Sequence, residues 1–433
     1  MTPGKLFATA VFAAIAGLSG AASAQVIAIQ NARVHTMGPA GVIEDGDVIL
    51  RDGVIAAIGQ NLPAPEGATV IDASGRIVTP GLFAPYSQIG LVEIGLDREA
   101  NDSSPRDDFA LSASLDAADA YNPTSTLIAI NRAGGITRAV SAPEPGDKLF
   151  GGRGMVVDLS GRVASITKPQ AVQVAAGGYA GARRAGDTRM GGWAVLREYL
   201  DEAISYAANP RDYVLRNRDE RFALRDIEAL GSVIAGQQPL LISANSAADI
   251  RTLLRLKERY RLNVIVLGGS EAWKDARELA AANVPVILDP LFNLPSQFED
   301  IGATLANAAR LHAAGVRISF YNPQGGETHN LRLLPQLAGN AVAAGLPYDA
   351  ALAALTINPA TMYGLQARLG SLEVGKLGDV VVWDGDPLEL STRPVAVFID
   401  GRAMSLENRQ TKLRDRYKDL SRGDLPLAYR GEN

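Results

Sequence analysis

The middle of the chain alternates between strand-like and helix-like segments, and this alternation constrains the fold most. PGLFAPY is the first strand-like run, followed by GITRAV, GMVVDL, AVQVAA, PLLISAN, NVIVLGG, VPVILDP and GVRISFYN. Helical segments such as WAVLREYLDEAISYA and AADIRTLLRLKERY separate the later runs. Strands that alternate with helices predict βαβ units and a parallel sheet. Eight such strands are the number that closes a (β/α)₈ TIM barrel, so we expect an α/β fold of this kind.

The first residues have the pattern of a signal peptide. Lys5 supplies a positive charge, LFATAVFAAIAGL is a short apolar run, and Ala22-Ser23-Ala24 is a small-x-small cleavage site. This pattern predicts cleavage after Ala24 and a periplasmic or secreted mature protein with no membrane association after cleavage. The alternative is an uncleaved membrane anchor, which the short apolar run disfavours.

Composition excludes several classes of function. The chain of 433 residues has no cysteine, which rules out disulfides, thiolate zinc sites and a cysteine nucleophile. Its formal net charge is −5, and no stripe of basic residues is visible. Nucleic acid is therefore not an expected partner.

Several phrases resemble one family along nearly the whole mature chain. GRIVTPGL enters the barrel, AADI and GSEAW follow strands five and six, and ALAALTINPATMYGL closes the barrel. GSLEVGKLGDVVVWDGDPL then returns the chain to the β-rich end. Together they resemble the amidohydrolase superfamily, in its imidazolonepropionase-like branch. The resemblance implies a TIM barrel plus a small β-sandwich formed by both chain ends. We therefore expect a signal peptide over 1–24, sandwich over 25–79, barrel over 80–365, and sandwich and tail over 366–433.

The same resemblance implies a metal site at the carboxyl ends of the strands. The family places His-x-His on strand one, Lys on strand four, His on strands five and six, and Asp on strand eight, usually around zinc. None of these residue types stands at the matching positions. The vacated positions, which we expect to line the pocket, are Tyr86, Gln88, Gln173, Ser243, Asn245, Gly268 and Tyr321 or Asn322.

The histidine count agrees with this interpretation. Only three histidines are present, and none lies on strands one, five or six. His35 falls in the N-terminal strands, His312 in a helix before strand eight, and His329 in the loop after it. We therefore expect no metal and no other cofactor.

Any surviving chemistry would need other acid–base groups. His329, Glu93, Asp97 and Asp289 are weak candidates near the predicted barrel mouth. His329 is either a group in the pocket or a loop histidine that caps the next helix. The carboxylates are either acid–base groups or solvated charges.

Three functions stay open at this stage. The first is a non-catalytic partner or regulatory subunit of an intact amidohydrolase. The expected partner is an intact amidohydrolase or a second copy of this chain in a homo-oligomer. The second is an active hydrolase of C–N bonds, such as amides, cyclic amides or dipeptides, with a metal-free or atypical site. The third is a binding protein for a polar small molecule in the vacated cavity.

Overall fold

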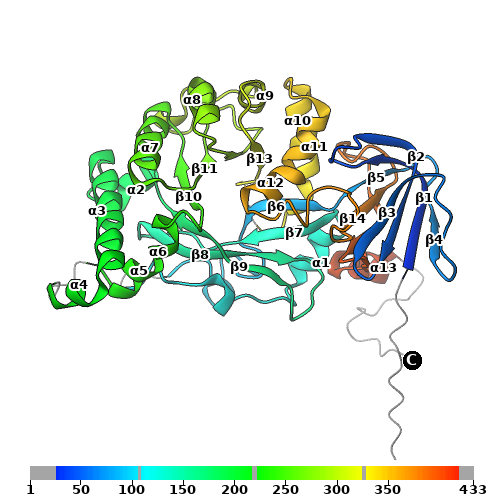
Figure 1. The fold of residues 1–433 in the computed structure, drawn as a ribbon, viewed down its shortest axis with the longest axis horizontal. Coiled ribbons are helices and arrows are strands. Elements are labelled where there is room, and N and C mark those ends of the chain that lie inside the picture. The colour runs from blue at the N-terminus through cyan, green and yellow to red at the C-terminus, as the bar shows by residue number, and fades with distance from the viewer. Residues whose placement is uncertain (1–25, 106–108, 217–221, 324–327, 419–433) are drawn as a thin grey trace, which may run out of the picture.

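The computed structural model describes residues 26–105, 109–216, 222–323 and 328–418 (Figure 1). The predicted signal peptide and its cleavage site lie outside these residues. No helix in the described ranges has the length and apolar character needed to cross a membrane.

Eight strands form the barrel sheet, and they neighbour one another in chain order, as the sequence predicts. The strands are β6 (Leu82–Ser87), β7 (Ile136–Ser141), β8 (Phe150–Asp158), β9 (Ile166–Ala175), β10 (Leu240–Ala244), β11 (Val264–Gly268), β12 (Val286–Leu288) and β13 (Ile318–Phe320). In the described part of the chain, no strand ladder joins β13 to β6. The Phe83 N–H instead donates to the Leu355 carbonyl at 2.8 Å, so the barrel is nearly closed.

One strand departs from the all-parallel prediction. β8 runs antiparallel to both β7 and β9. No helix lies between β7 and β8, so nothing carries the chain back to the end where a parallel strand would begin. Phe150 therefore pairs with Ala175 at the carboxyl end of β9, and Asp158 lies at the opposite end of the barrel.

Helices cover the outside of the barrel (Figure 1). They are α1 (Thr126–Arg132), α2 (Gly178–Arg183), α3 (Arg189–Ala208), α4 (Pro210–Arg216), α5 (Leu224–Ala229), α6 (Gly231–Ile234), α7 (Ala247–Tyr260), α8 (Ala276–Ala281), α9 (Asn307–Ala313), α10 (Leu334–Ala343), α11 (Tyr348–Ala354) and α12 (Ile357–Met362). α7 shows why such segments are helical. Ser246 caps its first turn by accepting from the Asp249 N–H at 3.1 Å, and Ile250, Leu253 and Leu256 form one buried face.

The barrel interior is a packed apolar core. Alternate strand residues meet inside it, namely Phe83, Val140, Val156, Val172, Val174, Leu241, Ile265 and Ile287. Tyr363, which follows α12, joins them; it is 1% exposed and donates from its hydroxyl to the Pro85 carbonyl at 2.6 Å. The interior is therefore filled by side chains and forms no channel.

A second, smaller sheet is built from both chain ends, as predicted. It contains β1 (Val26–His35), β2 (Val42–Arg51), β3 (Val54–Gln60), β4 (Thr69–Asp72), β5 (Ile77–Pro80), β14 (Val380–Trp383), β15 (Pro394–Ile399) and β16 (Arg402–Ala403). β1 pairs with β2 on one side and with β4 and β5 on the other, and β14 pairs with β5. This pairing brings the two ends of the chain together beside the barrel (Figure 1), and α13 (Arg409–Lys418) follows the last strand.

Arg138 on β7 links the barrel to the second sheet. Its Nε and Nη2 donate to the two carboxylate oxygens of Asp379, at 2.6 and 2.9 Å, and Nη2 also contacts Asp400. Asp158 lies 3.9 Å away, and the arginine is 2% exposed. Burial alone would lower the pKa of Arg138, but the surrounding carboxylates outweigh it and raise that pKa. The guanidinium is therefore charged at every pH at which the protein folds.

We expect Arg138→Met to destabilise the protein by about 3–5 kcal/mol, because it leaves buried carboxylates without their cation. Urea unfolding at pH 7 measures the loss. Arg33→Met is the control, since Arg33 and Glu44 form an exposed ion pair and should contribute at most about 1 kcal/mol. Equal losses in the two variants would show that the buried network does not hold the two parts together.

Asp400 should make stability depend on acid pH. Burial would raise the pKa of its carboxyl, but Arg138 and Arg162 outweigh burial and hold that pKa below its ordinary value. A depressed folded pKa adds stability above the unfolded pKa of about 3.9, and this stability is lost as pH falls through the lower folded value.

Asp400→Asn should therefore be less stable than the parent at neutral pH, and the gap should narrow as pH falls toward about 3. Asparagine tolerates the positive φ of 49° at this position. Urea unfolding across this pH range tests the prediction. Parallel stability curves for the two proteins would contradict it.

Candidate functional site

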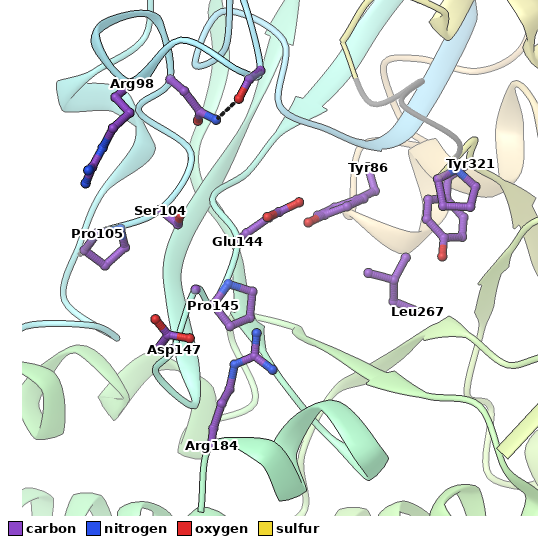
Figure 2. A pocket seen from close by; sticks show the side chains of 14 residues that line it. Tyr86, Arg98, Ser104, Pro105, Glu144, Pro145, Asp147, Arg184, Leu267 and Tyr321 are labelled. Atoms are coloured by element: carbon purple, nitrogen blue, oxygen red, sulfur yellow. Dashed lines mark hydrogen bonds between the residues drawn. The ribbon is translucent and has the colours of Figure 1, made fainter. Parts of the chain in front are cut away.

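A cleft of about 660 Å³ opens at the carboxyl end of the parallel barrel strands (Figure 2). Its lining consists of Tyr86, Gly95, Arg98, Asn101, Ser104, Pro105, Glu144, Pro145, Gly146, Asp147, Arg184, Leu267, Tyr321 and Pro323. Tyr86, Leu267 and Tyr321 also pack against the interior core, so they form the floor between cleft and barrel. The rings of Tyr86 and Tyr321 meet edge to face, with centroids 6.1 Å apart.

Of the vacated positions, Tyr86 and Tyr321 line this cleft, and the others do not. Tyr86 is 6% exposed and takes part in the interior core. Gln88, which directly follows β6, is also buried, and its Nε2 has no hydrogen-bond partner. Strand one thus presents an aromatic ring where the family resemblance expects the first histidine.

Gln173 corrects the predicted pocket lining. Its neighbours Val172 and Val174 both point into the barrel, so Gln173 points outward on the alternate face. Its pairing partner on β10, Leu240, belongs to the core between the strands and the helices. Gln173 is fully buried there, and neither of its amide atoms has a hydrogen-bond partner. The pocket prediction for this residue is therefore wrong.

The positions on strands five and six are engaged in local packing and hydrogen bonds. Ser243 accepts from the Gly177 N–H at 3.1 Å. Asn245 donates from Nδ2 to Glu299, at 3.0 Å, in the loop after β12. Gly268 has φ +95°, and a Cβ placed on it would lie 2.2 Å from the Asn245 Oδ1.

Glu299 extends this arrangement into a polar network. It also accepts from the Tyr179 N–H at 3.2 Å and pairs with Arg189 at 3.4 Å. Arg189 in turn contacts Asp249 at 3.0 Å. Burial raises the pKa of Glu299, and its hydrogen bonds with Asn245 and Tyr179 act in the opposite direction. The network ties the loop after β12 to α2, α3 and α7.

At the end of strand eight, either Tyr321 or Asn322 can match the position of the family's aspartate. The Tyr321 N–H donates to the Leu288 carbonyl at 3.2 Å, and its side chain reaches the cleft. Both residues are partly buried.

The residues at these positions do not fit a zinc ion. Zinc sites need imidazole, carboxylate or thiolate donors in a tetrahedral set. A phenol, an amide, a hydroxyl already used by a backbone N–H, and a glycine crowded by Asn245 do not supply such a set. Across the described ranges, no three His, Asp or Glu side chains gather closely enough to hold a metal ion.

The acid–base candidates lie outside the cleft and make local contacts. Glu93 accepts from Asn122 Nδ2 at 3.1 Å, and Asp97 accepts from the Glu99 N–H at 3.0 Å as a helix cap. Asp289 accepts from the Leu291 N–H at 2.9 Å, and burial raises the pKa of Asp289.

The histidines are placed as follows. His329 is exposed, and its Nδ1 lies 2.8 Å from the Thr328 hydroxyl. His35 is buried, with its ring 5.7 Å from that of Tyr348, and His312 is exposed on α9. The structure thus brings none of the three to the cleft.

The cleft also contains four charged residues that the sequence did not predict, namely Arg98, Glu144, Asp147 and Arg184. Asn101, Ser104 and Pro105, in the segment after β6, also line the cleft, and residues 106–108 lie outside the described residues. Arg184 directly follows α2, where nothing in the local sequence separates it from its exposed neighbour Arg183. Arg98 follows strand one, Glu144 and Asp147 follow strand two, and Arg184 follows strand four. Their place after the ends of these strands is the sequence signal that could have indicated the barrel mouth.

Comparisons with known proteins agree on one family. A model described as the amidohydrolase family matches residues 242–404. Imidazolonepropionase of Sphingopyxis alaskensis is 27% identical over 84% of this chain and 93% of its own length. Amidohydrolase tasK of Hapsidospora irregularis is 25% identical over 83% of this chain, which spans only 40% of that relative. The crystal structure of an amidohydrolase from Thermotoga maritima superposes with a TM-score of 0.78 at 28% identity, covering 88% of this chain and 99% of the other.

Gly268→Ala should cost about 1–3 kcal/mol more than Gly375→Ala, because the added methyl meets Asn245. Gly375 is a suitable control, since its φ of +88° is similar and open space surrounds it. Urea unfolding measures both. Adding Asn245→Ala to Gly268→Ala should recover part of the loss, and equal costs for the two glycines would contradict the crowding.

Proposed function

The chain belongs to the amidohydrolase superfamily and is imidazolonepropionase-like, and on that premise we propose that it is an exported, metal-free homologue that serves as a non-catalytic partner or regulatory subunit of an intact amidohydrolase.

The observation that carries this proposal is the use made of the vacated positions. Asn245 and Gly268 fit against each other, and Asn245 is bonded to Glu299 in a buried network. Tyr86 and Tyr321 close the floor of the cleft. Because these residues now serve packing, returning one histidine would not recreate a donor set. A scaffold kept intact while its ligand positions turn to packing supports a role in binding.

The relation to tasK is compatible with a partner role. The match spans 40% of that relative, so more of tasK lies outside the match than inside it. A domain like this one therefore occurs within a longer chain. If this chain and its partner are separate subunits, their association would bring together parts that tasK carries in one chain.

The alternative of an active C–N hydrolase with an atypical site requires an acid, a base or a nucleophile in the cleft. Glu144 and Asp147 are the carboxylates that line it, and both are exposed. Neither has a hydrogen bond to another described side chain that would orient it as a catalytic base. This observation favours the non-catalytic proposal over the alternative.

Metal content and turnover test the proposal together. We expect the purified mature protein, from residue 25 onward, to contain far less than one zinc per chain. We also expect no hydrolysis of dipeptides or cyclic amides, and no change in melting temperature with EDTA, since no folded-state donor set depends on metal. Elemental analysis, product detection and thermal melts make these measurements. Stoichiometric zinc with EDTA-sensitive turnover would overturn the proposal.

Association is the second test. Coexpression with an amidohydrolase that retains His-x-His, encoded by a neighbouring gene, should give a complex that survives size-exclusion chromatography. A catalytically intact homologue from an unrelated organism is the control. If the chain elutes alone beside its neighbour and leaves the activity of that neighbour unchanged, the partner role fails.

A further inference from the structure

The mouth cleft carries separate positive and negative side chains over an apolar floor. Figure 2 shows Glu144 directed toward Tyr86, and Arg184 beside Pro145 and Asp147. Arg98 lies on the wall formed by the loop after β6. Neither Glu144 nor Asp147 forms an ion pair within 4 Å in the described part of the chain, although Arg184 shares the cleft with both.

Arg184 is a partly buried arginine with an unpaired donor. Its Nη1 donates to the Ala180 carbonyl at 2.6 Å, whereas its Nε has no hydrogen-bond partner. Burial lowers the pKa of Arg184, and the more distant charges of Asp147 and Glu144 act against burial. An unpaired buried donor costs roughly 1–3 kcal/mol, so a shift of the Arg184 side chain that brings Nε to an acceptor on a ligand in the cleft would be favourable.

Two other arginines show what a saturated site looks like in this protein. Arg138 presents its Nε and Nη2 edge to both oxygens of one carboxylate, Asp379. Arg132 reaches the carbonyls of Leu159, Ser160 and Ser405. Arg184 uses Nη1 on its own helix, so the edge that Arg138 gives to a carboxylate is the edge that Arg184 leaves without a protein partner.

We propose that the cleft binds a small zwitterion with an apolar body. Such a ligand is an apolar amino acid or a short apolar peptide with free termini. The carboxylate of the ligand pairs with Arg184, its ammonium group lies at Glu144 and Asp147, and its apolar part covers Tyr86, Leu267 and Tyr321. The inference rests on the proposed function in one respect, which is that the ligand is bound and not cleaved. It differs from the earlier expectation of a polar ligand, because Tyr86, Leu267 and Tyr321 give the cleft an apolar floor.

Calorimetry of the mature protein with L-leucyl-L-leucine and L-leucine tests the proposal. We expect at least one of the two to bind, and N-acetyl-L-leucine and L-leucinamide, each lacking one charge, to bind about 10-fold more weakly or worse. Binding that is equally strong with capped and free termini would overturn the zwitterion. Absence of binding by both free probes would also overturn it and would show that the cleft charges are simply solvated.

Three variants locate the site. Arg184→Gln and Glu144→Gln should each weaken binding about 10-fold or more, and Arg183→Gln, on the exposed neighbour, should leave it unchanged. Glu144 is exposed, so its variant keeps the test decisive if Arg184→Gln folds poorly. If Glu144→Gln and a folded Arg184→Gln both bind with unchanged affinity, the ligand lies elsewhere.

The two proposals fail separately. Release of free leucine from leucyl-leucine by the protein would disprove the non-catalytic role while the binding site stands. Absence of binding in a protein that is free of zinc and still associates with its neighbour would disprove only the site.

Discussion

The bidentate contact between Arg138 and Asp379 joins the two parts of this protein. Arg138 lies on the second barrel strand, and Asp379 directly precedes the strand β14 that returns the chain to the smaller sheet. Asp400 adds a second carboxylate from the turn after β15, and the Asp400 N–H donates to Asp379 at 3.0 Å. Removing one of these carboxylates would destabilise the fold, because a buried charge without its partner raises the free energy of the folded state. The end of the barrel opposite the mouth is thus joined to the smaller sheet by charge.

The barrel interior is built mainly from strand side chains, and Tyr86, Leu267 and Tyr321 pack on it from the mouth. Valine, leucine and isoleucine side chains from the strands meet Tyr363 in a continuous apolar core. Above that core, the polar network around Glu299 ties the loop after β12 to the helices. In a metal enzyme of this fold, the ion would contribute to holding these loops. In this protein the hydrogen bonds of that network and the Tyr86–Tyr321 contact connect the elements around the mouth.

The sequence predicts the strands of the barrel well and the fine geometry of its mouth poorly, for physical reasons. Hydrophobic runs separated by turn residues indicate where strands lie, and all eight were found in order. The direction of β8 was missed because a run of apolar residues reads the same in either direction. Gln173 was misplaced because neighbouring residues on a strand face opposite sides, so a shift of one position moves a side chain out of the barrel. The charged lining of the cleft comes from loops, where sequence spacing carries little information on position.

The contrast between Arg138 and Arg184 separates an arginine that serves the fold from one that faces a cleft. Both guanidinium groups are at least partly buried, and both have carboxylates nearby. Arg138 contacts those carboxylates directly and serves the fold, whereas Arg184 stops short of Asp147 and Glu144 and keeps its Nε without a partner. Nothing in the packing of an exposed loop compels such a separation, since exposed acidic side chains can turn toward a neighbouring cation at little cost. Charges of opposite sign that face one cleft without meeting are therefore a better guide to binding here than the ligand positions that the family would supply.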